Sequence, residues 1–172
     1  MIISTNAGLW AYNVGDTVEF TSLNPYKVIV TGRIKHFISA FGEHVIAKEV
    51  EQAMNTAVSE TGIEISEFTV APKINPEEGL PYHEWFIEFE REPDSLNDFA
   101  QLIDRSLQEQ NSYYYDLIEG KVLQSLKITQ VKRNGFTNYM KSEGKLGGQN
   151  KLPRLSNDRK IADKLKELQL TK

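Results

Sequence analysis

The sequence predicts an α+β fold, in which a mixed or antiparallel sheet is flanked by helices and is preceded by a short β segment. Three observations support this class. Runs rich in β-branched and aromatic residues recur along the chain, bounded by glycine, proline or asparagine. Two longer segments instead space their apolar residues three and four positions apart, as amphipathic helices do. The two kinds of segment alternate, so we expect them to pack on one another.

The chain begins with two expected strands. The first lies in residues 10–22 (WAYNVGDTVEFTS) and is interrupted by Gly15 and Asp16, and the second covers residues 26–33 (YKVIVTGR). The Asn24-Pro25 pair between them favours a turn, which makes the start of the chain hairpin-like. Strand-like sequence begins at once, without a cap or a polar arm. We therefore expect this segment to be part of a larger sheet that the chain does not contain.

Three helices are expected in the middle of the chain. Residues 44–60 carry apolar residues at helical spacing, and Gly62 is placed to end that helix. Ser95 and Asp98 form a capping pattern before a second helix, and residues 113–118 form a short third one. The apolar positions of the first two helices are Ile46, Val50, Ala53, Met54, Ala57 and Val58, then Leu96, Phe99, Ile103 and Leu107.

The sheet is expected to consist of residues 66–73, 84–91 and 126–132. In the second of these strands apolar and charged residues alternate along the chain, so that Trp85, Ile87 and Phe89 face one side and Glu84, Glu88 and Glu90 the other.

The C-terminal part is expected to be helical. Residues 136–142 predict a helical turn, and Asn157 or Asp158 can cap a last helix that carries Ile161, Leu165 and Leu168.

Composition excludes several classes of protein. The 172 residues are 40% hydrophobic and 26% charged, as in an ordinary globular domain, and no apolar run is long enough to span a membrane. With neither a span nor a signal peptide, we expect a cytoplasmic protein without a membrane partner. The absence of cysteine excludes disulfides and thiolate metal sites, and the three histidines lack ligand spacing. A net charge of −4 argues against nucleic-acid binding.

The charge is unevenly distributed, however. From Lys151 onward seven basic residues oppose three acidic ones, so this tail carries +4 and the rest of the chain −8. The tail could therefore meet an anion. The glycine-rich segment before it, residues 144–151, is not a phosphate-binding loop, because neither Lys145 nor Lys151 is followed by serine or threonine. Judged alone, Lys151 would be an ordinary loop lysine, Asp16 a turn residue and Arg33 the end of a strand.

Three motifs in order change this interpretation. The segments AGLWAYNVGDTVEF, VTGRIKHFISAFGEHVIAKEVEQAM and GGQNKLPRL resemble the C-terminal part of the ANL superfamily of adenylate-forming enzymes. Within it the chain is most similar to the Gretchen Hagen family of auxin-responsive acyl-acid amido synthetases, in particular to its bacterial members. The resemblance covers nearly the whole chain, but only about the last third of such an enzyme. It implies that residues 1–31 end the N-terminal domain, 32–35 form a hinge and 36–172 form a C-terminal lid.

The resemblance also implies roles for five residues. Asp16 would bind the ribose hydroxyls of ATP, because a carboxylate accepts two hydrogen bonds from a vicinal diol. Arg33 would meet oxygens of the ribose and phosphates with its guanidinium fork. Lys35 would be the residue about which the lid rotates between half-reactions, and Gly42 would belong to the loop that enters the second half-site. Lys151 would be the mobile catalytic lysine, on a loop that the glycines before it make flexible and Pro153 limits.

The implied reaction has two steps. ATP, with Mg²⁺, and an acyl acid give an acyl-adenylate and pyrophosphate, and an amino acid then attacks the acyl carbon to form an amide. Because the phosphate loop and the substrate pockets would lie in an N-terminal domain, that domain is the expected partner, and the 172-residue chain alone is expected to be inactive. Two alternatives stay open at this point: a non-catalytic binding or regulatory module with the same fold, and the lid of an acyl-CoA ligase. Asn150 stands where the family usually has tyrosine, which bears on the nucleophile more than on adenylation.

Overall fold

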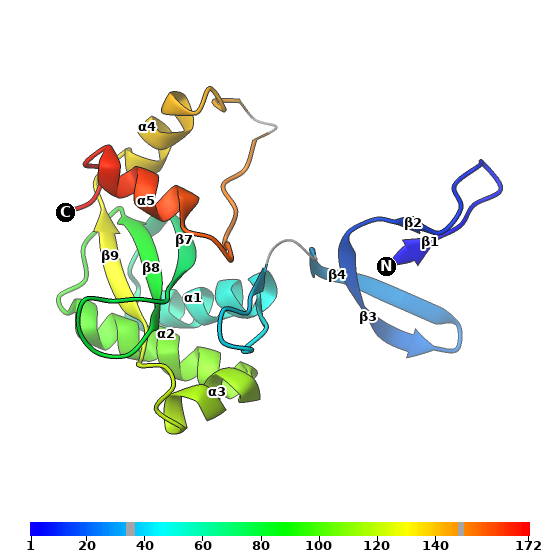
Figure 1. Cartoon of the computed structure of the whole chain (residues 1–172), viewed down its shortest axis with the longest axis horizontal. Coiled ribbons are helices and arrows are strands. Elements are labelled where there is room, and N and C mark those ends of the chain that lie inside the picture. Colours follow the sequence, from blue (N-terminus) through cyan, green and yellow to red (C-terminus); the bar gives the residue numbers. More distant parts are fainter. Residues whose placement is uncertain (34–36, 148–149) are drawn as a thin grey trace.

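The N-terminal part consists of two small antiparallel sheets. The computed structural model describes residues 1–33, 37–147 and 150–172. Strand β1 (Ile2–Ile3) pairs with β2 (Tyr12–Asn13), and β3 (Asp16–Leu23) pairs with β4 (Tyr26–Arg33). The β3–β4 hairpin turns at a cis Asn24-Pro25 bond, which confirms the two expected strands and the turn between them. Figure 1 shows both sheets at one side of the molecule. The expected hinge lies partly outside the described residues, so the division at 32–35 stays a prediction.

The central sheet has three strands of mixed direction. Strand β8 (Tyr82–Phe89) lies between β7 (Ile65–Lys73), to which it is antiparallel, and β9 (Lys127–Val131), to which it is parallel. Each edge strand also carries one isolated bridge, from Val70 to Leu155 and from Val131 to Thr171. The predicted mixed sheet is thus confirmed, and C-terminal segments cover both of its edges.

Helices on one face of the sheet build the larger core. They are α1 (Ala47–Thr61), α2 (Leu96–Gln110) and α3 (Ser112–Glu119), and all three were expected from the apolar spacing. Ser95 caps α2 by accepting a hydrogen bond from Asp98 N, and Gly62 ends α1 with a left-handed backbone, φ +64°. Buried side chains of these helices pack against Phe68, Val70, Trp85 and Ile87 of the sheet.

A short hairpin precedes α1 and was not predicted. Strands β5 (Phe37–Ile38) and β6 (Val45–Ile46) pair across the loop 39–44, and their side chains Ile38 and Val45 are fully buried. The expected helix from residue 44 therefore begins three residues later, at Ala47. Two residues per strand are too few for a periodic signal, which is why the sequence pattern did not separate the hairpin from the helix.

The opposite face of the sheet is covered by α4 (Gly135–Ser142) and α5 (Lys160–Glu167). These helices pack on Phe86, Ala71 and Val131 in a second apolar cluster. The charged face expected for β8 is therefore buried too, and Glu84 and Glu88 are only 3% and 5% exposed. The N-cap residue of α5 is Arg159, which makes no side-chain cap, so neither expected residue occupies that position. Asp158 Oδ1 just before it accepts a hydrogen bond from Lys160 N, whereas Asn157 bonds elsewhere. No helix in the described part of the chain combines the length and apolarity needed to cross a membrane.

Candidate functional site

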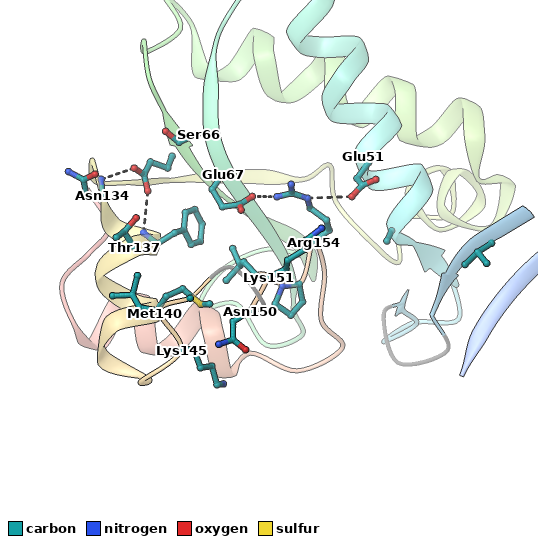
Figure 2. A pocket seen from close by; sticks show the side chains of 18 of the residues that line it. Glu51, Ser66, Glu67, Asn134, Thr137, Met140, Lys145, Asn150, Lys151 and Arg154 are labelled. Atoms are coloured by element: carbon teal, nitrogen blue, oxygen red, sulfur yellow. Dashed lines mark hydrogen bonds and ion pairs between the residues drawn. The ribbon is translucent and has the colours of Figure 1, made fainter. Parts of the chain in front are cut away.

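A groove runs between the N-terminal hairpin and the loop that joins α4 to α5. Its volume is about 1470 Å³. Asp16 and Val30 line it from the hairpin, Glu51 from α1 and Glu67 from β7, while Lys145 and residues 150–154 line it from the loop. Figure 2 labels Lys145, Asn150, Lys151 and Arg154 of this loop, with Lys151 between Arg154 and Met140. The groove thus collects residues from the first and the last part of the sequence.

Asp16 and Arg33 are brought together by strand pairing. Asp16 is the first residue of β3 and Arg33 the last residue of β4, and the antiparallel register places them directly opposite each other. Asp16 is half-buried and lines the groove. Two residues of different predicted motifs therefore meet at one end of the hairpin, next to the groove.

Lys151 lies just before the point where its loop becomes anchored. The side chain is exposed, whereas Leu152 and Leu155 are buried. Pro153 O accepts a hydrogen bond from Thr69 Oγ1 at 2.8 Å. Val70 N then donates to Arg154 O at 2.9 Å, and Ser156 N donates to Val70 O at 3.0 Å. Residues 153–156 thus run along β7 as a short parallel edge segment, which fixes where the lysine leaves the sheet.

Arg154 holds this edge segment at the groove. Its guanidinium pairs with Glu67 of β7 and, at 3.4 Å, with Glu51 of α1, and it lies 4.7 Å from the centre of the Phe68 ring. One side chain therefore links the loop to a helix and a strand (Figure 2). The contact also places a positive charge beside two carboxylates of the groove wall.

Glu88 and Glu84, the acids of the buried strand face, also have partners. Glu88 accepts hydrogen bonds from Asn134 N at 2.6 Å and Phe136 N at 3.2 Å, at the start of α4. Glu84 bonds to Arg159 and Lys166, both at 2.7 Å, and to Thr129 at 2.6 Å. Burial raises the pKa of Glu84, but the hydrogen bonds from Lys166, Thr129 and Arg159 outweigh it and leave that pKa below its ordinary value.

Two lysines on the groove wall differ from these paired groups. Among the residues that the structure describes, neither Lys145 nor Lys151 forms an ion pair, and both line the groove. Arg154 counters Glu51 and Glu67, and the α4 backbone counters Glu88, while these two ammonium groups are left to meet a ligand. The arrangement suits an anion more than a cation.

The loop expected to serve a second half-reaction is the one between β5 and β6. Gly42 is exposed there with φ +92°, a conformation that side chains other than glycine rarely adopt, and a Cβ would meet no other atom. The glycine is thus required by the backbone, and its proposed role in admitting substrate stays a prediction. Lys35, the expected hinge residue, falls outside the described residues.

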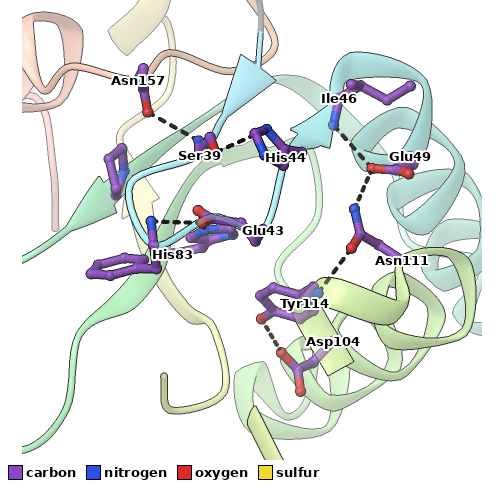
Figure 3. Close-up of polar contacts among 12 residues, drawn as sticks. Ser39, Glu43, His44, Ile46, Glu49, His83, Asp104, Asn111, Tyr114 and Asn157 are labelled. Carbon is purple, nitrogen blue, oxygen red and sulfur yellow. Dashed lines mark hydrogen bonds and ion pairs between the residues drawn. The ribbon is translucent and has the colours of Figure 1, made fainter. Parts of the chain in front are cut away.

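The sequence did not predict the roles of three residues at the groove and at the β5–β6 loop. Arg154 stood in the quoted motif GGQNKLPRL, but its clamp depends on two acids far away in the sequence. Glu43 and His83 form a fully buried pair beneath the β5–β6 loop, with 2.9 Å between Oε1 and Nε2 (Figure 3). The spacing of forty residues between them carries no local pattern.

Comparison with known proteins identifies the fold. The family model of the GH3 family C-terminal domain matches residues 48–160, which is more than half of the chain. The chain belongs to the GH3 family. This confirms the family that the three sequence motifs resemble, and the match covers α1 through the start of α5.

Solved GH3 structures extend the likeness to the N-terminal hairpin. A GH3.15 acyl acid amido synthetase superposes with a TM-score of 0.76 at 18% identity, covering 99% of this chain and 33% of that one. A second structure, AtGH3.15 acyl acid amido synthetase in complex with 2,4-DB, gives 0.73 at 18% identity, covering 99% and 32%. No curated protein sequence matches the chain. This GH3 chain therefore spans about one third of the length of those enzymes and has the fold of that part of them.

Proposed function

We propose that this chain is the C-terminal lid of an ATP-dependent acyl-acid amido synthetase. In the first step a carboxylate oxygen of the acyl acid attacks the α-phosphorus of ATP, and the bond to pyrophosphate breaks. In the second step an amino acid nitrogen attacks the acyl carbon, AMP leaves, and the nitrogen loses a proton. Membership of the GH3 family and the names of the matching solved structures support this proposal.

One observation carries it: Asp16 and Lys151, from opposite ends of the sequence, line the same groove. In the proposed reaction Asp16 accepts hydrogen bonds from the ribose hydroxyls of ATP, and Arg33, opposite it in the hairpin, meets neighbouring oxygens. Lys151 brings an ammonium group to the oxygens that gain charge as the α-phosphorus is attacked.

The electrostatics of the groove agree with an anionic substrate. ATP would be repelled by Glu51 and Glu67 if these acids were unpaired, and Arg154 pairs with both. Lys145 and Lys151 supply positive charge on the same wall. The anchor at Pro153 then determines how far Lys151 can reach from the sheet.

Mg²⁺ is expected to come to this site with the phosphates of ATP. The described residues do not fit a magnesium site of their own, since no three histidine, aspartate or glutamate side chains gather among them in a suitable group. The chain's own residues would therefore bind the nucleotide, and an N-terminal portion would supply the metal ligands together with the acyl and amino acid pockets. That portion is the partner that this proposal requires.

The proposal is tested by acid-dependent exchange of labelled pyrophosphate into ATP, over a panel of aromatic and aliphatic acids. The chain joined to its N-terminal portion should support exchange, and the 172-residue chain alone should not. Lys151→Ala should lower the exchange rate at least about a hundredfold, because losing such a contact costs on the order of 3 kcal/mol. Lys145→Ala is the matched control, since it removes a second exposed lysine from the same groove. Equal losses in both variants would contradict the role of Lys151.

A second candidate function is a non-catalytic binding module. The observation in its favour is the apolar surface of the β3–β4 hairpin, where Phe20, Tyr26 and Val30 are 58%, 77% and 63% exposed. In the first proposal this surface packs on the N-terminal portion, and in the second it binds another protein. The mass of the protein in its native cells separates them, since a module would be close to 19.6 kDa. The form of the product decides between an amide synthetase and an acyl-CoA ligase: amide with an amino acid, thioester with coenzyme A.

A further inference from the structure

The loop between β5 and β6 is held in one conformation by contacts on several sides. It spans residues 39–44, and Gly42 and His44, on either side of Glu43, both have left-handed backbones, with φ of +92° and +50°. This conformation is costly for the non-glycine residue His44, and it turns the side chain of Glu43 inward. Ser39 Oγ lies 3.0 Å from His44 Nδ1, which closes the loop across its base.

Glu43 connects the tip of this loop to the central sheet. Its Oε2 accepts a hydrogen bond from the backbone N of Phe41 at 2.8 Å, and its Oε1 lies 2.9 Å from Nε2 of His83 on β8. Both side chains are fully buried (Figure 3). Burial raises the pKa of Glu43, but the hydrogen bond from His83 and those from the backbone outweigh it, so this pKa lies below its ordinary value. One carboxylate thus fixes a loop amide relative to a core strand.

His83 is itself held by the surrounding core. Its ring lies 5.2 Å from the ring of Tyr114, whose hydroxyl donates to Asp104 at 2.6 Å. Its Nδ1 is buried and has no hydrogen-bond partner in the described part of the chain. An unpaired acceptor is tolerated better than an unpaired N–H, so we assign the tautomer in which Nε2 carries the proton and donates it to Glu43. The imidazole therefore has one function in the fold, which is to hold Glu43.

Stability alone does not account for this pair. Two well-packed apolar residues in the same space are often as stabilising as a buried charged pair or more so, because taking a charge such as the Glu43 carboxylate out of water is costly. What apolar residues would not provide is the hydrogen bond to Phe41 N, and hence a fixed position for the exposed Gly42 beside it. The pair thus specifies one conformation of the loop.

We propose that Glu43 and His83 are positioning residues, which hold the loop 39–44 in the conformation needed for attack of the amine on the acyl-adenylate. This inference rests on the proposed function, because it assigns the loop to the second of the two steps. It separates the two steps within one chain: Lys151 in the groove acts in adenylation, and the Glu43–His83 pair acts through the loop in amide formation. Neither positioning residue need touch a substrate.

The test compares Glu43→Ala and Glu43→Gln with wild type, each in the chain joined to its N-terminal portion. Two quantities are measured: the ratio of amide formation to pyrophosphate exchange, and hydrogen exchange of the backbone amides in residues 37–46. Glu43→Ala should lower amide formation about a hundredfold, the effect of a displacement of about 1 Å, and leave pyrophosphate exchange little changed. Glu43→Gln can still bond to Phe41 N and should retain part of the activity. Ile103→Ala, a cavity in the α2 core that leaves the loop hydrogen bonds intact, controls for lost stability.

Each outcome decides a different statement. A fall in the ratio with faster hydrogen exchange in the loop, absent from Ile103→Ala, supports the inference. Equal losses in both steps, or a faster-exchanging loop with an unchanged ratio, overturn it and leave the pair a structural one. If wild type shows no pyrophosphate exchange, the proposed function is wrong. In that case hydrogen exchange still tests the loop: an unchanged exchange rate of its amides in Glu43→Ala would show that Glu43 does not hold the loop.

Discussion

Glu84 offers the sharpest test of how the C-terminal helix is attached to the sheet. The carboxylate is only 3% exposed. It accepts hydrogen bonds from Arg159 and Lys166 of the α5 region and from Thr129 of β9, at distances of 2.6 to 2.7 Å. Arg159 also donates to Pro72 O of β7 at 3.0 Å. One buried charge therefore joins α5 to two strands, and Arg159 closely follows the edge segment that anchors Lys151.

The magnitude follows from what Glu84→Gln leaves behind. Removing one partner of a buried ion pair costs about 3–5 kcal/mol, because the other charge stays buried and uncompensated. Here Lys166 is 43% exposed and can turn to water, while Arg159 keeps Asp163 at 3.2 Å. We therefore expect a loss near the lower end, about 3 kcal/mol in the free energy of unfolding. Glu167→Gln breaks an exposed pair with Lys164 and should cost less than about 1 kcal/mol.

Urea unfolding followed by tryptophan fluorescence measures this difference. Trp85, next to Glu84 on β8, is fully buried and reports on the sheet, while Trp10 is 87% exposed and should change little. The two variants and wild type should share one slope with urea and differ in midpoint. A loss below about 1 kcal/mol in Glu84→Gln would refute the reasoning, since the buried carboxylate would then be no more important than a surface one.

Two further predictions concern the clamp and the response to acid. Arg154→Ala removes two half-exposed ion pairs and a cation–π contact. We therefore expect a loss of about 1–2 kcal/mol in the free energy of unfolding in urea and faster hydrogen exchange in residues 150–156. Unchanged exchange there would show that Arg154 does not hold the loop. Glu43 and Glu84 have pKa values below the ordinary 4.5, so the stability they contribute is present above that pH and is lost as pH falls through their folded-state values. The variant carrying Glu43→Gln and Glu84→Gln should lose less unfolding free energy than wild type between about pH 7 and pH 3, and an equal loss would assign the acid response to other groups.

Local signals were enough to predict most elements of the fold. The helical spacing of Val50, Ala53 and Met54 predicted α1, the Ser95 pattern predicted the start of α2, and the apolar alternation about Trp85 predicted β8. In each case the residues that determine the element are close together in the sequence, where helix or strand propensity and capping act directly. The structure brings Asp16 and Arg33 together by an equally local rule, since a hairpin aligns residues on either side of a single turn, although the sequence pattern did not predict their pairing.

The remainder depends on contacts between distant segments. The alternating acids of β8 predicted a charged face, but α4 and α5 cover that face because they bring Asn134 N, Arg159 and Lys166 to the carboxylates. A carboxylate with partners from remote segments has the same local pattern as one in water, so periodicity cannot distinguish them. The Glu43–His83 pair was missed for this reason, and the small β5–β6 hairpin because its strands are too short to show a period.

The two loops assigned to the two steps are joined to one another. Asn157 Oδ1, just beyond the edge segment that anchors Lys151, accepts a hydrogen bond at 3.1 Å from the backbone N of Ser39, at the base of the loop that carries Gly42 (Figure 3). Val70 of the central sheet forms backbone hydrogen bonds to the same edge segment. His83, on the adjacent strand, contacts Glu43 of the other loop, so both loops are attached to the central sheet. Loops fixed to one sheet cannot exchange places by moving independently. In the proposed two-step reaction, we therefore expect the change from adenylation to amide formation to come from rotation of the whole lid as a rigid body, which would carry Lys151 out of the reacting site and Gly42 toward it.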